Sequence, residues 1–287
     1  MGPGGVLILA AVLGAVGGAS AWVLTRETFA QPLFLRTNVR GAEVPVAVGV
    51  LVPVVLVAAA SLLVLADSAD WFEVATGPLL TTVLGATGFG MLGLLDDLAG
   101  DGSSRGFGGH LRALASGRLT TGAVKLFGGG AVALLVASTV SDERPARLLA
   151  DAALIALSAN LANLLDRAPG RVVKCSLLAA VPIALVAGVD GRLAGAVVVL
   201  AAASALLVPD LRERLMQGDT GANVLGSTLG IAVVLTTAPS TRSIVLFVVL
   251  GLNLVSERVS FSRVIDRTPP LRAFDRLGRL PLDRDAR

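Results

Sequence analysis

Cysteine and histidine are almost absent from this sequence, in which Cys175 and His110 are the only examples among 287 residues. A single cysteine excludes a disulfide framework, and the two residues together are too few for the clusters that hold zinc. A Ser-His-Asp triad or a Cys-His pair for acyl transfer is likewise not expected. Cys175 is best explained as a small packing residue within a helix.

Polar sequence is scarce as well. Hydrophobic residues make up 54% of the chain, the mean hydropathy is +0.79, and apolar runs approach membrane-spanning length, roughly 20 residues. The runs are continuous rather than alternating, which excludes a transmembrane β-barrel. The first run, 2–24, has no basic segment before it and is predicted to be a retained span rather than a cleaved signal peptide. The predicted fold is an all-α, polytopic integral membrane bundle.

The apolar runs and the basic residues together predict nine spans with the N-terminus outside and the C-terminus inside. When the connecting loops are assigned alternately to two sides, one side carries 20 Lys and Arg residues and the other carries 4. Positive charge marks the cytoplasmic face. Residues 1–256 are therefore predicted as a transmembrane domain and 257–287 as a basic cytoplasmic segment. The predicted spans lie near 2–24, 44–66, 76–95, 122–140, 148–165, 175–189, 193–208, 221–238 and 244–256.

Two aspartates, Asp96 and Asp97, end the third apolar run on the predicted cytoplasmic side. Neighbours on a helix point about 100° apart, so the two carboxylates cannot clamp one atom. A division of labour is predicted instead, in which one contacts a substrate or metal and the other holds a nearby loop. A solvated helix end is the open alternative.

A second polar group, Asn160, Asn163 and Asp166, repeats at i, i+3 and i+6 and so lies along one helical face. Unpaired amides are costly in hydrocarbon and need partners. Hydrogen bonding between helices would satisfy the amides. It would not explain the carboxylate that completes the stripe.

The third group places Asp219 and Thr220 between Gly218 and Gly221, at the start of another apolar helix. Glycines allow close approach of a ligand, and Thr220 with the first amides of the helix would cradle an anion. Simple N-capping is the alternative. Carboxylates on one face, surrounded by basic loops, indicate a magnesium–phosphate site, because Mg²⁺ takes one or two carboxylates and leaves its other positions to water and phosphates.

These groups, in this order and on this side, resemble the polyprenyl-phosphate N-acetylhexosamine-1-phosphate transferases, which include phospho-N-acetylmuramoyl-pentapeptide transferase. The family's aspartate pair is similar to Asp96-Asp97, and its Asn-x-x-Asp-Gly-x-Asp signature is similar to residues 160–166. Its Gly-Asp-Thr-Gly-Ser-x-x-x-Gly motif is similar to 218–226, and its first cytoplasmic loop to 38–49. The resemblance spans roughly residues 36–230.

The resemblance implies transfer of a sugar 1-phosphate from a UDP-sugar to a polyprenyl phosphate such as undecaprenyl phosphate. UMP would be released, as a step of cell-wall biogenesis in a bacterial plasma membrane. It implies a Mg²⁺ cofactor and membrane lipid as a partner, with no nucleic acid; a homodimer is left open. The implied metal ligands are Asp219 and Asp166. The implied catalytic residues are Asp96, Asp97 and Asp166. The implied substrate-binding residues are Asn160, Asn163, Lys125, Arg112 and Thr220.

Two other classes stay open beside the transferase. The family's Asp-Gly is Asn163-Leu164 here, and Ser256–Arg287 contains no histidine where the family has a histidine-rich loop. A non-catalytic relative that binds lipid-linked precursors or partners in envelope assembly would fit these differences. A lipid or solute transporter is the third class, although the sequence has no clear inverted repeat.

The arginine-rich C-terminal segment has apolar residues at near-helical spacing, interrupted by Pro269-Pro270. This pattern predicts two short amphipathic helices at the cytoplasmic interface. A merely positive tail is the alternative.

Overall fold

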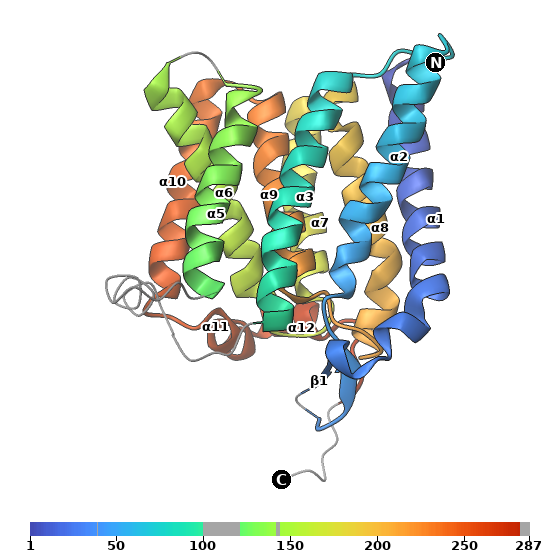
Figure 1. Ribbon diagram of the computed structural model, residues 1–287. Helices are drawn as coiled ribbons and strands as arrows, with labels where there is room; N and C mark the ends of the chain where they lie inside the picture. Colours follow the sequence, from blue (N-terminus) through green and yellow to red (C-terminus); the bar gives the residue numbers. More distant parts are fainter. Residues whose placement is uncertain (39, 100–120, 142–143, 282–287) are drawn as a thin grey trace.

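The computed structural model describes residues 1–38, 40–99, 121–141 and 144–281. These residues form eleven α-helices and a small antiparallel hairpin, β1 (Leu35–Thr37) and β2 (Glu43–Pro45) (Figure 1). Nine of the helices are long, and each overlaps one of the predicted ranges. They are α1 (Pro3–Phe29), α2 (Leu51–Ser68), α3 (Thr76–Ala99), α5 (Thr121–Ser138), α6 (Pro145–Leu165), α7 (Arg171–Ala187), α8 (Ala194–Leu211), α9 (Gly218–Thr236) and α10 (Pro239–Ser256).

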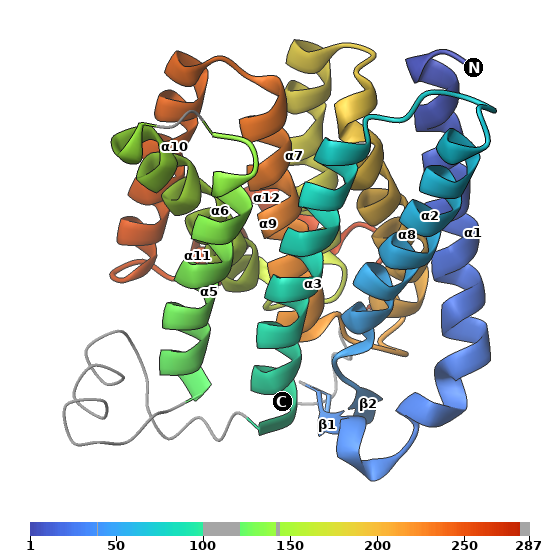
Figure 2. The same ribbon diagram turned by 45° about the horizontal axis from the view of Figure 1, so that its top comes forward.

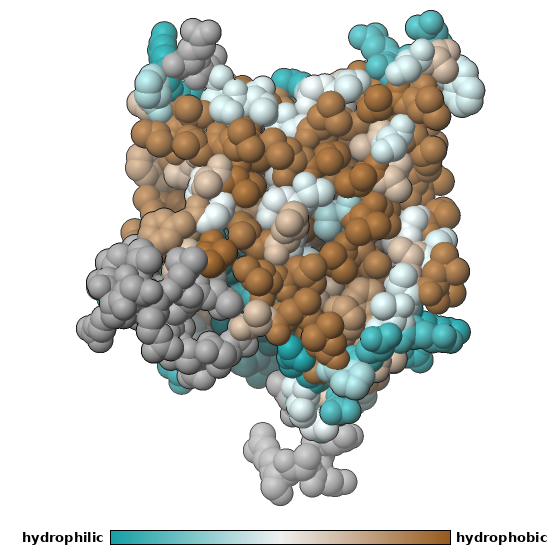
Figure 3. All heavy atoms as spheres, in the orientation of Figure 1, coloured by the Kyte–Doolittle hydropathy of each residue, from teal (hydrophilic) through white to brown (hydrophobic). Residues whose placement is uncertain are grey.

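On the face shown in Figure 3, an apolar belt lies between two more polar ends of the bundle. Among the described residues, six helices are long and apolar enough to cross a membrane. This supports the predicted all-α, membrane-embedded bundle. The six are Pro3–Phe29, Val48–Ser68, Thr76–Ala99, Pro145–Leu165, Gly191–Leu211 and Pro239–Ser256.

Helix α9 lies in the middle of the bundle and packs against α3, α6 and α7 (Figure 2). Sixteen of its 19 residues are buried. Its glycines permit this packing, because a Cβ on Gly226 would lie 2.3 Å from the carbonyl oxygen of Ser158 in α6. Small residues let helix backbones approach closely where apolar driving force is weak. The buried polar residues of α9 are therefore covered by protein rather than by lipid; they are Thr220, Asn223, Ser227 and Thr228.

The C-terminal segment folds back under one end of the bundle as two short helices, α11 (Phe261–Arg267) and α12 (Pro269–Arg276) (Figure 1). The predicted pair of helices broken at Pro269-Pro270 is thus confirmed. A buried ion pair holds α12: Nε and Nη2 of Arg171 lie 2.6 and 3.1 Å from the two carboxylate oxygens of Asp275. Both residues are 4% exposed.

The Asp275 carboxylate also faces Arg279 at 2.7 Å, and Lys174 donates to the backbone carbonyls of Phe274 and Asp275. Burial alone would raise the pKa of Asp275, but the hydrogen bonds and charge of Arg171, with the charges of Arg279 and Lys174, hold the pKa below its usual 3.8. The tail is anchored by charge pairing to the bundle.

Candidate functional site

The polar groups identified in the sequence come together at the end of the bundle where α11 and α12 lie. Asp96 comes from the last turns of α3, Lys125 from the first turns of α5, Asn163 from the end of α6 and Asp219 from the start of α9. Nζ of Lys125 forms an ion pair with Oδ2 of Asp219 and lies 3.4 Å from Oδ2 of Asp96. Three helices thus supply two carboxylates and one ammonium to a single cluster.

Asn163 completes this cluster. Its amide nitrogen lies 3.4 Å from Oδ2 of Asp219. The opposite amide orientation pairs donors with acceptors better: the nitrogen then donates to Oδ1 of Asp219 at 2.7 Å, and the oxygen accepts from Lys125 at 2.9 Å. The side chains of Asp96, Lys125 and Asp219 remain between 20 and 32% exposed, so a ligand can reach them.

Asp97 has a different position from Asp96. Its carboxylate accepts hydrogen bonds from the backbone N–H of Asp219 at 2.9 Å, from the N–H of Thr220 at 3.0 Å and from the Thr220 hydroxyl at 2.6 Å. Gly218, at φ +70°, makes room for it, since a Cβ there would lie 2.6 Å from Oδ2 of Asp97. Asp97 thus holds a neighbouring segment, as one half of the predicted division of labour requires, and contact of Asp96 with a substrate or metal stays a prediction.

The first amides of α9 are therefore engaged by Asp97. The sequence predicted that these amides and Thr220 would cradle an anion, and the anion that they bind is the Asp97 carboxylate. An acidic side chain is favourable at a helix N-terminus for the same reason that a ligand phosphate would be. Asp97 holds the start of α9 and thereby positions Asp219.

Asp166 follows the last residue of α6, and the charges of Asp210, Asp219 and Asp97 all act on its carboxyl. Loss of water around Asp166 raises the pKa of its carboxyl well above the usual 3.8, and the charges of Asp210 and Asp219 raise it further. Such a carboxyl readily takes a proton or a cation. Its assignment as a metal ligand stays a prediction.

Asp210, at the end of α8, was not among the candidate site residues predicted from the sequence. It is 3% exposed, and its Oδ2 has no hydrogen-bond partner among the described residues. Its position could have identified it, because Asp210 stands at the end of an apolar run, as Asp96 does.

Asn160, also in the predicted set, has its partner elsewhere in the bundle. Asn160 donates from Nδ2 to Oδ1 of Asn253 in α10 at 2.7 Å, and Asn253 in turn donates to the carbonyl of Leu157. This is the helix–helix hydrogen bonding that the sequence left as an alternative. Arg112 lies outside the described residues.

The donor set can be compared with the needs of a metal ion. Among the described residues, no group of three or more His, Cys, Asp or Glu side chains is placed to hold a metal. Mg²⁺ needs only one or two carboxylates, and Asp96, Asp219 and the Asn163 amide oxygen supply hard oxygen donors. The Lys125 ammonium lies among these atoms and pairs with both carboxylates. The oxygens are of the kind that Mg²⁺ prefers, and binding of Mg²⁺ stays a prediction.

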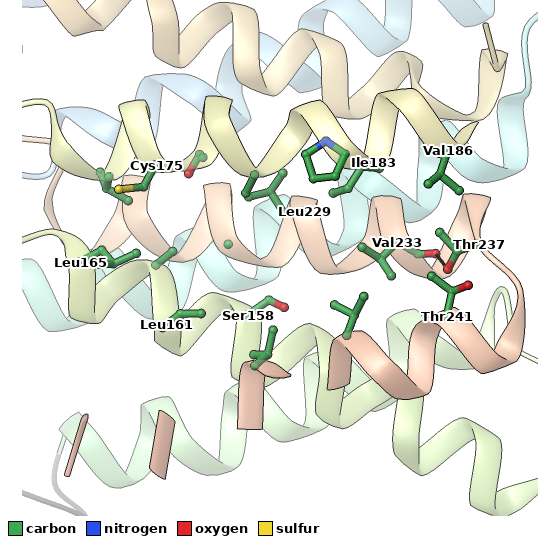
Figure 4. Close-up of a pocket in the computed structure, with 18 residues that line it drawn as sticks. Ser158, Leu161, Leu165, Cys175, Ile183, Val186, Leu229, Val233, Thr237 and Thr241 are labelled. Atoms are coloured by element: carbon green, nitrogen blue, oxygen red, sulfur yellow. Dashed lines mark hydrogen bonds between the residues drawn. The ribbon is translucent and has the colours of Figure 1, made fainter. Parts of the chain in front are cut away.

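An apolar cavity of about 280 Å³ lies between α6, α7, α9 and α10 (Figure 4). Leu165 and Cys175 line one end of it, and Val186, Thr237 and Thr241 line the other. Leu165 directly precedes Asp166. The cavity therefore extends from the carboxylate end along the depth of the bundle.

Neither protein-family models nor curated proteins give a match to this chain. The membership in the sugar-phosphate transferase family stays a prediction from the motifs.

Proposed function

We propose that this chain is a divergent, magnesium-dependent phosphoglycosyltransferase that passes a sugar 1-phosphate from a UDP-sugar to a polyprenyl phosphate. The observation that carries the proposal is the convergence of Asp96, Lys125, Asn163 and Asp219 at one end of a membrane bundle. A charged phosphate would sit in this cluster while its lipid chain lies in apolar surroundings.

The chemistry needs charge neutralisation more than a strong base. A phosphate monoester is mostly dianionic at neutral pH, since its second pKa is about 6, so it is already a competent nucleophile. The main barrier is the approach of two anions. Bound Mg²⁺ would offset this repulsion, with oxygens of Asp219, Asp96 and Asn163 to hold it. Lys125 would then contact phosphate oxygens.

The apolar cavity beside Leu165 supports a lipid substrate. Its walls come from four helices, and it runs along them from Leu165 and Cys175 to Thr237 and Thr241. A prenyl chain gains roughly 0.8 kcal/mol for each CH₂ group that leaves water. The cavity would hold the first isoprene units and present the phosphate near Asp166.

The proposed topology has nine spans, with the carboxylate end in the cytoplasm of a bacterial plasma membrane. The 20-to-4 distribution of basic residues supports it. Reporter fusions after Arg287 should read as cytoplasmic, and fusions within 67–77 should read as external. An external signal from the Arg287 fusion would contradict both the topology and access of a UDP-sugar to the cluster.

The decisive assay mixes the purified chain with undecaprenyl phosphate, Mg²⁺ and a panel of UDP-sugars, and measures UMP. We expect Mg²⁺-dependent UMP release with at least one sugar, and no release without the lipid phosphate. Asp266→Asn is the matched control, because Asp266 is an exposed carboxylate of α11 at the same end.

A non-catalytic relative is the second candidate. The Lys125 ammonium already pairs with Asp219 and lies close to Asp96, as expected of a cluster that works without a metal. Retention of undecaprenyl phosphate without UMP release for any sugar would favour this candidate over the transferase.

A further inference from the structure

The end of the bundle opposite the carboxylate cluster is poor in basic residues, yet three of its four arginines gather in one place. Arg147 comes from α6, Arg192 from the short 3-10 helix Gly191–Leu193, and Arg242 from α10. The positive-inside tendency depletes Lys and Arg from this side. A concentration of arginine there therefore calls for a local explanation.

One part of the explanation is Asp151, which is fully buried. Its Oδ2 accepts from Nη1 of Arg242 at 2.9 Å and from the Ser141 hydroxyl at 2.8 Å, and its Oδ1 lies 3.7 Å from Nη1 of Arg147. One carboxylate thus faces two guanidinium groups. The pairing leaves positive charge in excess.

A cavity of about 490 Å³ adjoins this ion cluster. Arg192 and Arg242 are the charged residues among those that line it, and they approach it from different elements. Both are fixed by the end of α9: Arg192 donates to the carbonyl of Leu235, and Nε of Arg242 donates to the carbonyl of Thr237. The hydrogen bonds of Arg242 to Thr237 and Asp151 use its Nε and Nη1.

The remaining walls of this cavity are mostly apolar and include Leu80, Leu84, Val140 and Val234. Thr81 adds a hydroxyl, held 2.9 Å from that of Thr139. Arginine is suited to phosphate because its planar fork can donate two parallel hydrogen bonds. A wall that combines two arginines with leucine and valine matches an amphiphile better than a free ion.

We propose that this cavity binds the phosphate group of an anionic membrane lipid, with Arg192 and Arg242 on the phosphate and the apolar wall against the acyl chains. The site is independent of the proposed transferase reaction, since it lies at the opposite end of the bundle. Its occupant would brace the ends of α3, α9 and α10, which all contribute to the wall.

Native mass spectrometry of the full chain in detergent tests the proposal, with phosphatidylglycerol, phosphatidylcholine and inorganic phosphate as probes. We expect retention of phosphatidylglycerol above phosphatidylcholine. Arg192→Gln should weaken it roughly tenfold, the size of one charge-assisted hydrogen bond. Arg192 is the better site for substitution, because its side chain is 47% exposed and its ion pair with Asp190 is local.

Arg192→Lys keeps the charge and should retain part of the binding, which distinguishes a lost contact from a lost fold. Arg144→Gln is the matched control, because Arg144 is an exposed arginine at the same end that does not line the cavity. An equal loss in Arg144→Gln would overturn the site in favour of general surface attraction. Binding of inorganic phosphate alone would overturn the lipid as its occupant. Unchanged binding in Arg192→Gln would mean that the arginines only cap α9 and neutralise Asp151.

Discussion

The two ends of the bundle hold ionic clusters of opposite composition. At the carboxylate end, the Lys125 ammonium lies among Asp96 and Asp219 and remains within reach of solvent. At the other end, the fully buried Asp151 lies among Arg147 and Arg242. In each case a single ion faces two of the opposite sign. The first cluster therefore has an excess negative charge that would favour a second cation, and the second has an excess positive charge that would favour an anion.

Burial separates the two clusters further. A buried ion pair contributes little net stability, but removing one partner is costly because the other charge is left without compensation. A partly exposed pair can exchange its partners for water or ligand at low cost. The Asp151 cluster should therefore matter mainly for folding, and the Asp219 cluster mainly for ligand binding.

The largest expected effect on stability is that of Asp151→Ala. It leaves Arg147 and Arg242 facing a buried space without their carboxylate, and we expect a loss of about 3–5 kcal/mol in the free energy of unfolding. Thermal unfolding in detergent would measure it. Asp190→Ala, which breaks the half-exposed pair with Arg192, is the comparison and should cost no more than about 1 kcal/mol. Equal effects would remove the distinction drawn from burial.

Asp219→Asn should instead reduce activity strongly and leave the stability of the fold nearly unchanged. Asparagine keeps the shape and can still accept hydrogen bonds from Lys125 and Asn163, but it lacks the charge that holds a hard cation. We expect UMP release to fall roughly a hundredfold, as when one strong electrostatic contact to a transition state is lost. The unfolding temperature should hardly change. Full Mg²⁺-dependent turnover in this variant would falsify the proposed role of Asp219.

The smallest effect concerns the ion pair that anchors α12. The pKa of Asp275 is lower in the folded chain than the usual 3.8. The stability from its pairing is therefore present above pH 3.8 and is lost as the pH falls through the folded value. Pepsin should cleave within 261–276 at pH values below the folded pKa of Asp275, and should leave this segment intact at pH values just above 3.8. In Arg171→Gln, cleavage should occur across the whole range; protection in this variant would show that the pair does not hold the tail.

The position of each helix and of the carboxylates could be predicted from the sequence, because hydropathy fixes where an apolar run ends. Asp96, Asp166 and Asp219 all stand at such ends, and alternation of the spans places them on one side. The same rule would have identified Asp210. What each side chain contacts could not be read in this way.

Partner choice depends on packing between distant segments. Asn160 donates a hydrogen bond to Asn253, 93 positions away in the sequence. Asp97 accepts hydrogen bonds from the first amides of α9, more than 120 positions away. The motif alone therefore left the amides of α9 open to a ligand, although a neighbouring helix uses them. Arg171 offered no sign in the sequence that its partner would be Asp275 rather than a phosphate.

The central position of α9 has a consequence for how the protein is made. This helix has 19 residues but is not among the six most suited to span a membrane, because glycine, threonine, serine and asparagine dilute its apolar residues. A segment of that kind partitions poorly from the translocon into lipid alone. Helices α3 and α6 are synthesised first and present the surfaces that cover it. We therefore expect α3 and α6 to stay near the exit site until α9 emerges, so that α9 leaves the translocon into protein, and α10 then packs against α6.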